Sequence, residues 1–434
     1  MKRTVDRYFF VWALLAPVTS VLILPTVQGT VPAFMMCFLS LFVVIVAGGE
    51  ERPRYFGLLF TCVLIWLLFF ALSQFADLLV NYVVSFHDVV LNRVTDHSFV
   101  MRSSLFTQSL YLVAVMLFGV FVYVYYDERW DRVLIAGGVL MALFGLYEFA
   151  FFSIVGHTGD FLTNRGFGTA LGKEAVARLD SQRIVLAGHT FERLRSLTGE
   201  PSMYAFSIFP YWIYARAASR SRWPSLLIGV SLILTASTTA AVGLVCALAV
   251  RALRMRVDVV KCLLAVLALL VFAYLFRHTL LAFYQHGILD KIEGKNASGH
   301  ERFGYFLGSV KFWLSLPLLN QFVGIGFGYV RSTDMASTLL VNNGILGVLL
   351  FTFIFLYPVF RLDWSEKSMA LRQCLVSVYV MMMVSVPEFS YLAPWAFVAL
   401  AYHRLSQSAR AASPYAADPA GAGAALPLTR GYGS

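Results

Sequence analysis

Long apolar runs recur along the whole chain, and most of them are nearly free of charged residues. A helix needs about 20 apolar residues to cross a bilayer, and residues 56–76 provide such a run. A soluble fold has no interior large enough to bury many runs of this kind, so the sequence predicts an all-α polytopic membrane protein. Single crossings are predicted at 8–26, 31–48, 56–76, 104–126, 133–154, 203–217, 258–276, 337–359, 373–386 and 389–402.

The composition supports this class. Hydrophobic residues make up 59% of the 434 residues and charged residues 13%, whereas a soluble domain is about 25% charged. The net charge of +10 would suggest nucleic acid as the partner of a soluble protein, but in a membrane protein Lys and Arg collect in cytoplasmic loops. No nucleic-acid partner is therefore expected. The basic, apolar N-terminus resembles a signal peptide, and we interpret it as a retained first span.

The apolar stretch 225–251 differs from the others because arginines flank it on both sides. A single crossing would place one basic cluster outside, against the positive-inside tendency. Two short half-spans that meet at "TASTTA" (235–240) would keep both clusters inside, and the hydroxyl groups there can satisfy an interrupted backbone. We therefore predict a short helical hairpin at 225–251, for a total of about 12 transmembrane helices. The alternative is one long tilted helix.

The distribution of basic residues also predicts the orientation. Five short loops are rich in Arg or Lys, which favours the cytoplasm for these loops and for both termini. The membrane-embedded domain is then 1–402, and the Ala-, Pro- and Gly-rich segment 403–434 is predicted to be a disordered cytoplasmic tail. The amphipathic residues 76–94 are predicted to lie along the outer interface. Large loops on the opposite, periplasmic face are predicted near 77–103, 155–202 and 277–336.

Charged residues stand directly before an apolar run in "RLRSLTGEPSMYAF" (193–206). Arg193, Arg195 and Glu200 would lie at the outer boundary of the bilayer, where Pro201 favours the start of a helix. The planar guanidinium fork of arginine suits phosphate oxygens. A phosphate-binding site is one interpretation, and an ordinary interfacial salt bridge is the other.

A second polar region follows in the last large loop. His300 and Arg302 begin a segment that is predicted to be helical and interfacial, or else form a solvated charge cluster. The glycines of "GIGFG" predict a tight turn rather than a nucleotide fingerprint, because no βαβ unit surrounds them. Arg331 and Asp334 then precede another span.

One carboxylate falls inside a span. Glu148 lies in "FGLYEFAFF" near the outer end of the run 133–154, and an intramembrane carboxylate is a functional candidate by default. Equally, it can be protonated or paired with an arginine of the outer loop. The sequence contains no P-loop, no paired Asp motif and no His/Cys cluster suited to zinc, so no metal and no cofactor are expected.

Four motifs in order resemble the O-antigen polymerase and ligase superfamily, the Wzy/WaaL type of bacterial glycosyltransferase. They are "RLRSLTGEPSMYA", "LTASTTAAVGL", "ERFGYFLGSVKFW" with "GIGFG", and "DMASTLLVNNGILGVLLF", and together they cover roughly 190–350. The N-terminal half is similar only in its pattern of spans. The resemblance implies a GT-C-like helical fold with an active site in the large periplasmic loops.

The resemblance also implies a substrate and residue roles. The donor would be an oligosaccharide linked to undecaprenyl pyrophosphate, and Arg195 and Arg302, with Arg331, would bind the pyrophosphate. The general base would be Asp334, which we prefer by position, or Glu200, with Glu148, His300 and Arg193 in support. Partners would include a chain-length regulator and a flippase. Two positions depart from the family: Asp334 stands where ligases usually have His, and Thr238 where the family often has Arg.

The function expected from these features is that of an inner-membrane polysaccharide polymerase, either for O-antigen or for exopolysaccharide. It would transfer the growing glycan from its lipid carrier to the next lipid-linked repeat unit. Two alternatives stay open at this point. One is an O-antigen ligase that acts on lipid A-core, and the other is a transporter of lipid-linked sugars without catalysis.

Overall fold

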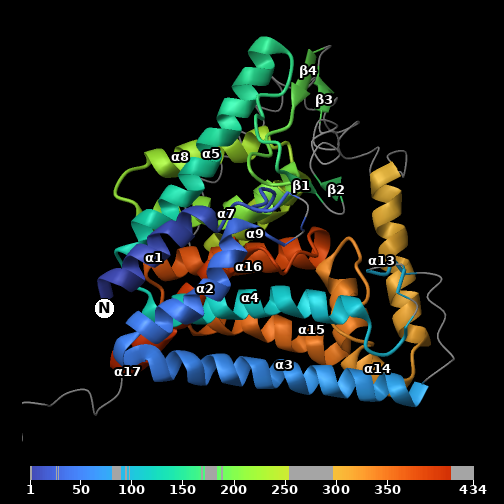
Figure 1. The fold of residues 1–434 in the computed structure, drawn as a ribbon. Coiled ribbons are helices and arrows are strands. Elements are labelled where there is room, and N and C mark those ends of the chain that lie inside the picture. The colour runs from blue at the N-terminus through green and yellow to red at the C-terminus, as the bar shows by residue number, and fades with distance from the viewer. Residues whose placement is uncertain are drawn as a thin grey trace, which may run out of the picture.

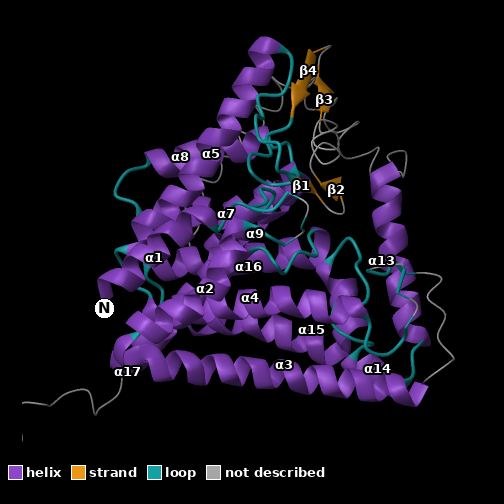
Figure 2. Cartoon of the chain, in the orientation of Figure 1, coloured by secondary structure: helices purple, strands orange, loops and turns teal. Residues whose placement is uncertain are grey.

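The computed structural model describes residues 2–25, 27, 29–80, 89–92, 95–96, 98–167, 170–171, 183–186, 189–253 and 297–411. This part of the chain is mostly helical (Figures 1 and 2). Five of its helices are long and apolar enough to cross a membrane: Gly49–Leu79, Ser103–Tyr125, Trp130–Val155, Met335–Arg361 and Glu366–Ser385. The structure therefore agrees with an all-α membrane protein.

The helices have the following bounds: α1 (Lys2–Leu15), α2 (Pro32–Ala47), η1 (Gly49–Glu51), α3 (Arg52–Val80), α4 (Ser103–Tyr125), α5 (Trp130–Val155), α7 (Pro201–Ala218), α8 (Trp223–Leu234), α9 (Thr238–Ala252), α13 (Ala297–Ser315), α14 (Leu318–Val323), α15 (Met335–Arg361), α16 (Glu366–Ser385) and α17 (Leu392–Ala411). α17 continues past residue 402, so the helix extends into the predicted tail. The predicted span 258–276 and residues 412–434 lie outside the described residues.

α16 lies in the middle of the bundle, since it packs against α7, α9, α15 and α17. α3 lies at the edge, where it contacts α4 and the short α14. α13 stands across one end of the bundle, roughly perpendicular to α4, α15 and α16 (Figure 1). This is the orientation expected of a helix that lies along a membrane interface.

Two ends of the bundle differ in chemistry. At the first, which we call the basic end, the polar connectors form ion pairs across elements: Lys2 with Asp127, Arg129 with Asp6, and Lys367 with Asp131. The start of α1 and the C-terminal turns of α17 both lie at this end, where Arg404 pairs with Asp363. The second end, which we call the loop end, contains the described parts of the connectors 16–31 and 156–200, together with the connectors 235–237, 324–334 and 386–391.

The first helix is shorter than predicted. α1 ends at Leu15, whereas the apolar pattern suggested a span over 8–26. Pro17 has no backbone N–H and disfavours helical conformation in the residue before it. The chain instead turns after Leu15, and Val21 forms an antiparallel β-bridge with Arg165.

The long loop before α7 contains strands, which the sequence pattern did not indicate. β1 (Gly166–Phe167) pairs with β2 (Ala170–Leu171), and β3 (Arg183–Leu186) pairs with β4 (His189–Glu192), both antiparallel. β4 also contacts α5. The described part of the loop therefore folds onto the C-terminal end of α5 (Figure 2).

The apolar stretch 225–251 forms two helices, α8 and α9, as predicted from its flanking arginines. Ala236 between them has a positive φ of 45°, and the Ser237 hydroxyl accepts a hydrogen bond from Thr239 N, which caps α9. Arg216 and Arg251 are close enough for their charges to interact, so the two basic flanks lie at the same end. α7 packs against both helices.

The glycine-rich turn before α15 packs directly against that helix. Gly324 has a φ of 78°, and a Cβ there would lie 2.2 Å from the Asn342 carbonyl oxygen. The Asn342 side chain accepts a hydrogen bond from Val330 N and donates one to Val330 O, both at 2.8 Å. Asn342 therefore holds the turn against α15.

Gly344 breaks the helical geometry of α15, with a φ of 63° and a ψ of −166°. A Cβ there would lie 2.3 Å from the Phe322 carbonyl oxygen. We expect Gly344→Ala to lower the free energy of unfolding by about 3 kcal/mol, because a non-glycine residue is strained at positive φ and also meets backbone here. Thermal unfolding in detergent measures the loss. Gly57→Ala, where a Cβ meets nothing within 4 Å, is the control, and equal melting temperatures would contradict the prediction.

Candidate functional site

An arginine and a glutamate from distant parts of the chain meet at the loop end. Arg331 precedes α15, and Glu388 lies in the turn between α16 and α17. The two side chains form an ion pair in which the Arg331 side chain is 50% exposed. The Glu388 charge raises the pKa of Arg331. Arg331 is thus a cation that remains accessible to a ligand.

Glu200 and Arg193 lie close to this pair. Glu200 stands directly before α7, and its carboxylate accepts a hydrogen bond from the Ser202 hydroxyl at 3.0 Å. Its charge acts on both Arg193 and Arg331. We call Arg193, Glu200, Arg331 and Glu388 the outer charge cluster, where "outer" means only that they lie at the loop end of the bundle.

Arg193 connects this cluster to the break between α8 and α9. Its Nε donates to the Thr235 carbonyl at 3.0 Å and its Nη2 to the Ala236 carbonyl at 3.2 Å. These carbonyls are available because the helix is interrupted there, as the final C=O groups of a helix have no partner within it. Burial lowers the pKa of Arg193, and the nearby Glu200 opposes that shift.

An apolar cavity of about 630 Å³ reaches the outer charge cluster. Arg331 and Glu388 line it at the loop end, and Tyr123 and Tyr402 line it towards the basic end. Its walls come from α3, α4, α15 and α17, and they include Leu58, Cys62, Trp66, Leu112, Met116, Leu350, Phe351 and Ile354. The volume is in the range of about 300–1,000 Å³ that is usual for small-molecule sites.

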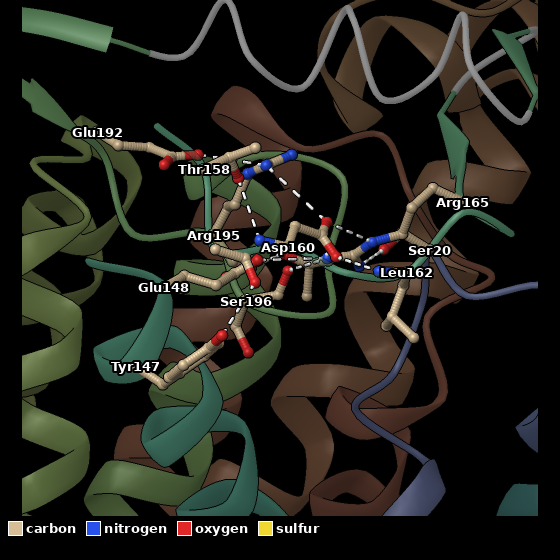
Figure 3. A network of polar contacts seen from close by, with 12 residues as sticks. Ser20, Tyr147, Glu148, Thr158, Asp160, Leu162, Arg165, Glu192, Arg195 and Ser196 are labelled. Carbon is tan, nitrogen blue, oxygen red and sulfur yellow. Dashed lines mark hydrogen bonds and ion pairs between the residues drawn. The ribbon is translucent and has the colours of Figure 1, made fainter. Parts of the chain in front are cut away.

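A second polar network is buried between α5 and the long loop (Figure 3). Arg165 donates from Nε and Nη2 to one carboxylate oxygen of Asp160, at 2.9 and 2.6 Å. Arg165 Nη2 also lies 3.5 Å from Glu148, and Arg195 Nη2 lies 3.2 Å from Glu192. We call Glu148, Asp160, Arg165, Glu192 and Arg195 the buried ion network.

Two residues that the sequence proposed for the site, Glu148 and Arg195, belong to the buried ion network. Glu148 pairs with Arg165 of the outer loop, which is the structural alternative that the sequence left open for it. The Arg195 side chain is 1% exposed and does not line the cavity. Its three guanidinium nitrogens are buried without a hydrogen-bond acceptor among the described residues, although carboxylates neutralise its charge.

Arg302 and His300 both lie in α13. Arg302 is exposed, and its carbonyl accepts a hydrogen bond from the Thr333 hydroxyl at 3.5 Å. The start of α13 therefore lies beside the segment that contains Arg331. Arg195 and Arg302 were predicted to bind one pyrophosphate together, but neither of them lines the cavity. The side chain of His300 lies outside the described residues.

Asp334 is the N-cap of α15. Its carboxylate accepts hydrogen bonds from Ser337 N at 2.7 Å, from the Ser337 hydroxyl at 2.8 Å and from the Ser332 hydroxyl at 3.2 Å. The residue is 4% exposed. Three hydrogen bonds from its own segment therefore occupy the Asp334 carboxylate, whereas within the described part of the chain the Glu200 carboxylate accepts one, from Ser202.

The capping geometry gives a prediction that distinguishes the role of Asp334 from that of Glu200. We expect Asp334→Asn to keep most of the activity, because Asn caps a helix as well as Asp does, and Asp334→Ala to lose about 1 kcal/mol of stability. Thermal unfolding and product length measure the two effects. Loss of activity in a well-folded Asp334→Asn protein would instead make Asp334 the general base.

Four residues of the two clusters were not among the sequence candidates: Glu388, Asp160, Arg165 and Glu192. Glu388 lies in a short turn between two predicted spans. A carboxylate at such a position is a signal that could have identified it as a candidate site residue. Asp160 and Arg165 lie in a long polar loop, where spacing gives no hint that they meet Glu148. Their pairing depends on how the loop folds back onto α5.

Within the described ranges, no group of three or more His, Cys, Asp or Glu side chains is arranged to hold a metal ion. Comparison of the chain with protein-family models, with curated proteins and with solved structures finds no match in any of the three.

Proposed function

We propose that this protein is an inner-membrane polysaccharide polymerase that uses an undecaprenyl-pyrophosphate-linked glycan as donor. The observation that supports this most directly is the apolar cavity that ends at the Arg331–Glu388 pair. A lipid-linked pyrophosphate needs both features at once: an apolar surface for the polyprenyl chain and an accessible cation for the phosphates.

The orientation follows from the charges of the two ends. Lys and Arg concentrate in the connectors of the basic end, and short basic loops favour the cytoplasm. The loop end, with the outer charge cluster, then faces the periplasm. There the pyrophosphate of a lipid-linked glycan would lie at the membrane surface while its polyprenyl chain remained among the helices.

The proposed reaction forms one glycosidic bond and breaks one sugar–phosphate bond. A hydroxyl of the acceptor unit attacks C1 of the donor sugar, the C1–O bond to pyrophosphate breaks, and the hydroxyl proton passes to a carboxylate. Negative charge builds on the leaving pyrophosphate, where Arg331 and the neighbouring Arg302 would stabilise it. Glu200 is the carboxylate that we propose as the general base, because it stands at the start of α7 with a hydrogen bond from Ser202 and its charge acts on Arg331.

The decisive experiment uses purified protein in lipid nanodiscs with a defined lipid-linked repeat unit and no added nucleotide. Elongated lipid-linked products support the polymerase. Transfer only when lipid A-core is supplied would identify a ligase. In a parallel assay with the protein in sealed proteoliposomes, movement of intact lipid-linked units across the bilayer without bond formation would identify a transporter.

A further inference from the structure

The geometry of the buried ion network points to Asp160 as a positioning residue: we propose that its carboxylate holds Arg165 and Arg195 together and so fixes the segment 193–200. That segment places Arg193 and Glu200 in the outer charge cluster. The consequence for turnover depends on the proposed function, whereas the consequence for the position of the segment does not.

Asp160 is the member of the network that lies between the two arginines (Figure 3). One of its oxygens accepts both hydrogen bonds from Arg165, and the same oxygen lies 4.0 Å from Arg195 Nη2. The Asp160 side chain is 1% exposed and that of Arg165 is 0% exposed. Removing one partner from a buried charge group leaves the others uncompensated and is strongly unfavourable.

Arg165 transmits this constraint to the segment 193–200. Its Nη2 donates to the Ser196 carbonyl at 3.2 Å, and its Nη1 donates to the Ser20 hydroxyl at 2.5 Å. The backbone of the connector 19–22 lies between the two loop segments. The Leu197 carbonyl accepts from Thr19 N at 3.1 Å, and Gly166 N donates to the Ser20 carbonyl at 2.8 Å.

The same segment then reaches the outer charge cluster through its own backbone. Leu194 N donates to the Leu234 carbonyl at 3.1 Å, next to the two carbonyls that Arg193 binds. Glu200 follows at the start of α7. Asp160 does not line the cavity, so it acts on the site by holding other residues in place and not by contact with a substrate.

The test is hydrogen exchange on the full-length protein in nanodiscs, together with elongation kinetics, for Asp160→Asn and Asp160→Glu. We expect Asp160→Asn to raise amide exchange at least tenfold in peptides that cover 16–24 and 193–200, since loss of the ion network opens these hydrogen bonds locally. The kcat for elongation should fall at least tenfold with little change in the KM for the lipid-linked donor. Asp160→Glu, which keeps the carboxylate, should recover part of both.

Asp96→Asn is the matched control. Asp96 is also an acidic residue of an outer loop, and it accepts hydrogen bonds from Ser98 and Ser103, but it belongs to neither cluster. Exchange in 16–24 and 193–200 should not change in this variant. If Asp160→Asn unfolds the protein, exchange will also rise in 126–132 at the basic end. In that case the Ser20→Ala variant is used instead of Asp160→Asn, because it removes only one hydrogen bond of Arg165. Amide exchange in the same two peptides should then rise about threefold.

Unchanged exchange in 193–200 would overturn the proposal, and so would faster exchange with an unchanged kcat. If the wild-type protein forms no polymer, the proposed function fails. The exchange data still decide whether Asp160 fixes the segment.

Discussion

Arg331→Gln should lower the rate of elongation about 10²- to 10³-fold while the protein still folds and inserts. The magnitude is that of removing one preorganised donor from a developing negative charge. Arg331 is the half-exposed cation at the loop end of the cavity, and its guanidinium group is charged at any physiological pH. The measurement is the initial rate of product formation from a defined lipid-linked repeat unit.

Arg129→Gln is the matched control for this experiment. Arg129 is an exposed arginine that also forms ion pairs, with Asp6 and Asp127, but it lies at the basic end. Its substitution should leave the rate within a factor of about two, because exposed ion pairs contribute little and this one lies at the end opposite the cavity opening. An elongation rate near that of the wild type in Arg331→Gln would remove Arg331 from the proposed pyrophosphate site.

Gly119→Phe should block the cavity. Gly119 lies in α4 and lines the cavity, and a Cβ there would meet nothing within 4 Å. A phenylalanine side chain can therefore enter the cavity without displacing the backbone, and replacing glycine within a helix is itself favourable by about 0.5 kcal/mol. We expect at least a tenfold loss in kcat/KM for a donor with a full-length polyprenyl chain and a smaller loss for a donor with a short chain.

Gly57→Phe makes the same substitution without reaching the cavity. Gly57 lies in α3, is exposed, and has nothing within 4 Å of its Cβ position. This variant should elongate both donors at the wild-type rate. Equal losses for long and short donors in Gly119→Phe would show that the cavity does not hold the polyprenyl chain.

The candidate site shows which features can be predicted from local sequence patterns. The break between α8 and α9 was predictable, because arginines flank the apolar stretch and hydroxyl residues stand at its centre. The N-cap of α15 could also be predicted, since an Asp directly before an apolar run indicates the start of a helix. The sequence analysis nevertheless assigned Asp334 the role of a general base and did not consider that it caps the helix.

The sequence by itself determined the class of protein and the two chemically different ends. These properties depend on the length of each apolar run and on the positions of Arg and Lys. They do not depend on how the helices pack against one another. Only the tertiary structure decided which arginines face a cavity and which are buried. Arg331 meets Glu388 and Arg165 meets Glu148 across long separations in the chain, and the charge of a guanidinium group is useful to a ligand only where folding leaves it exposed.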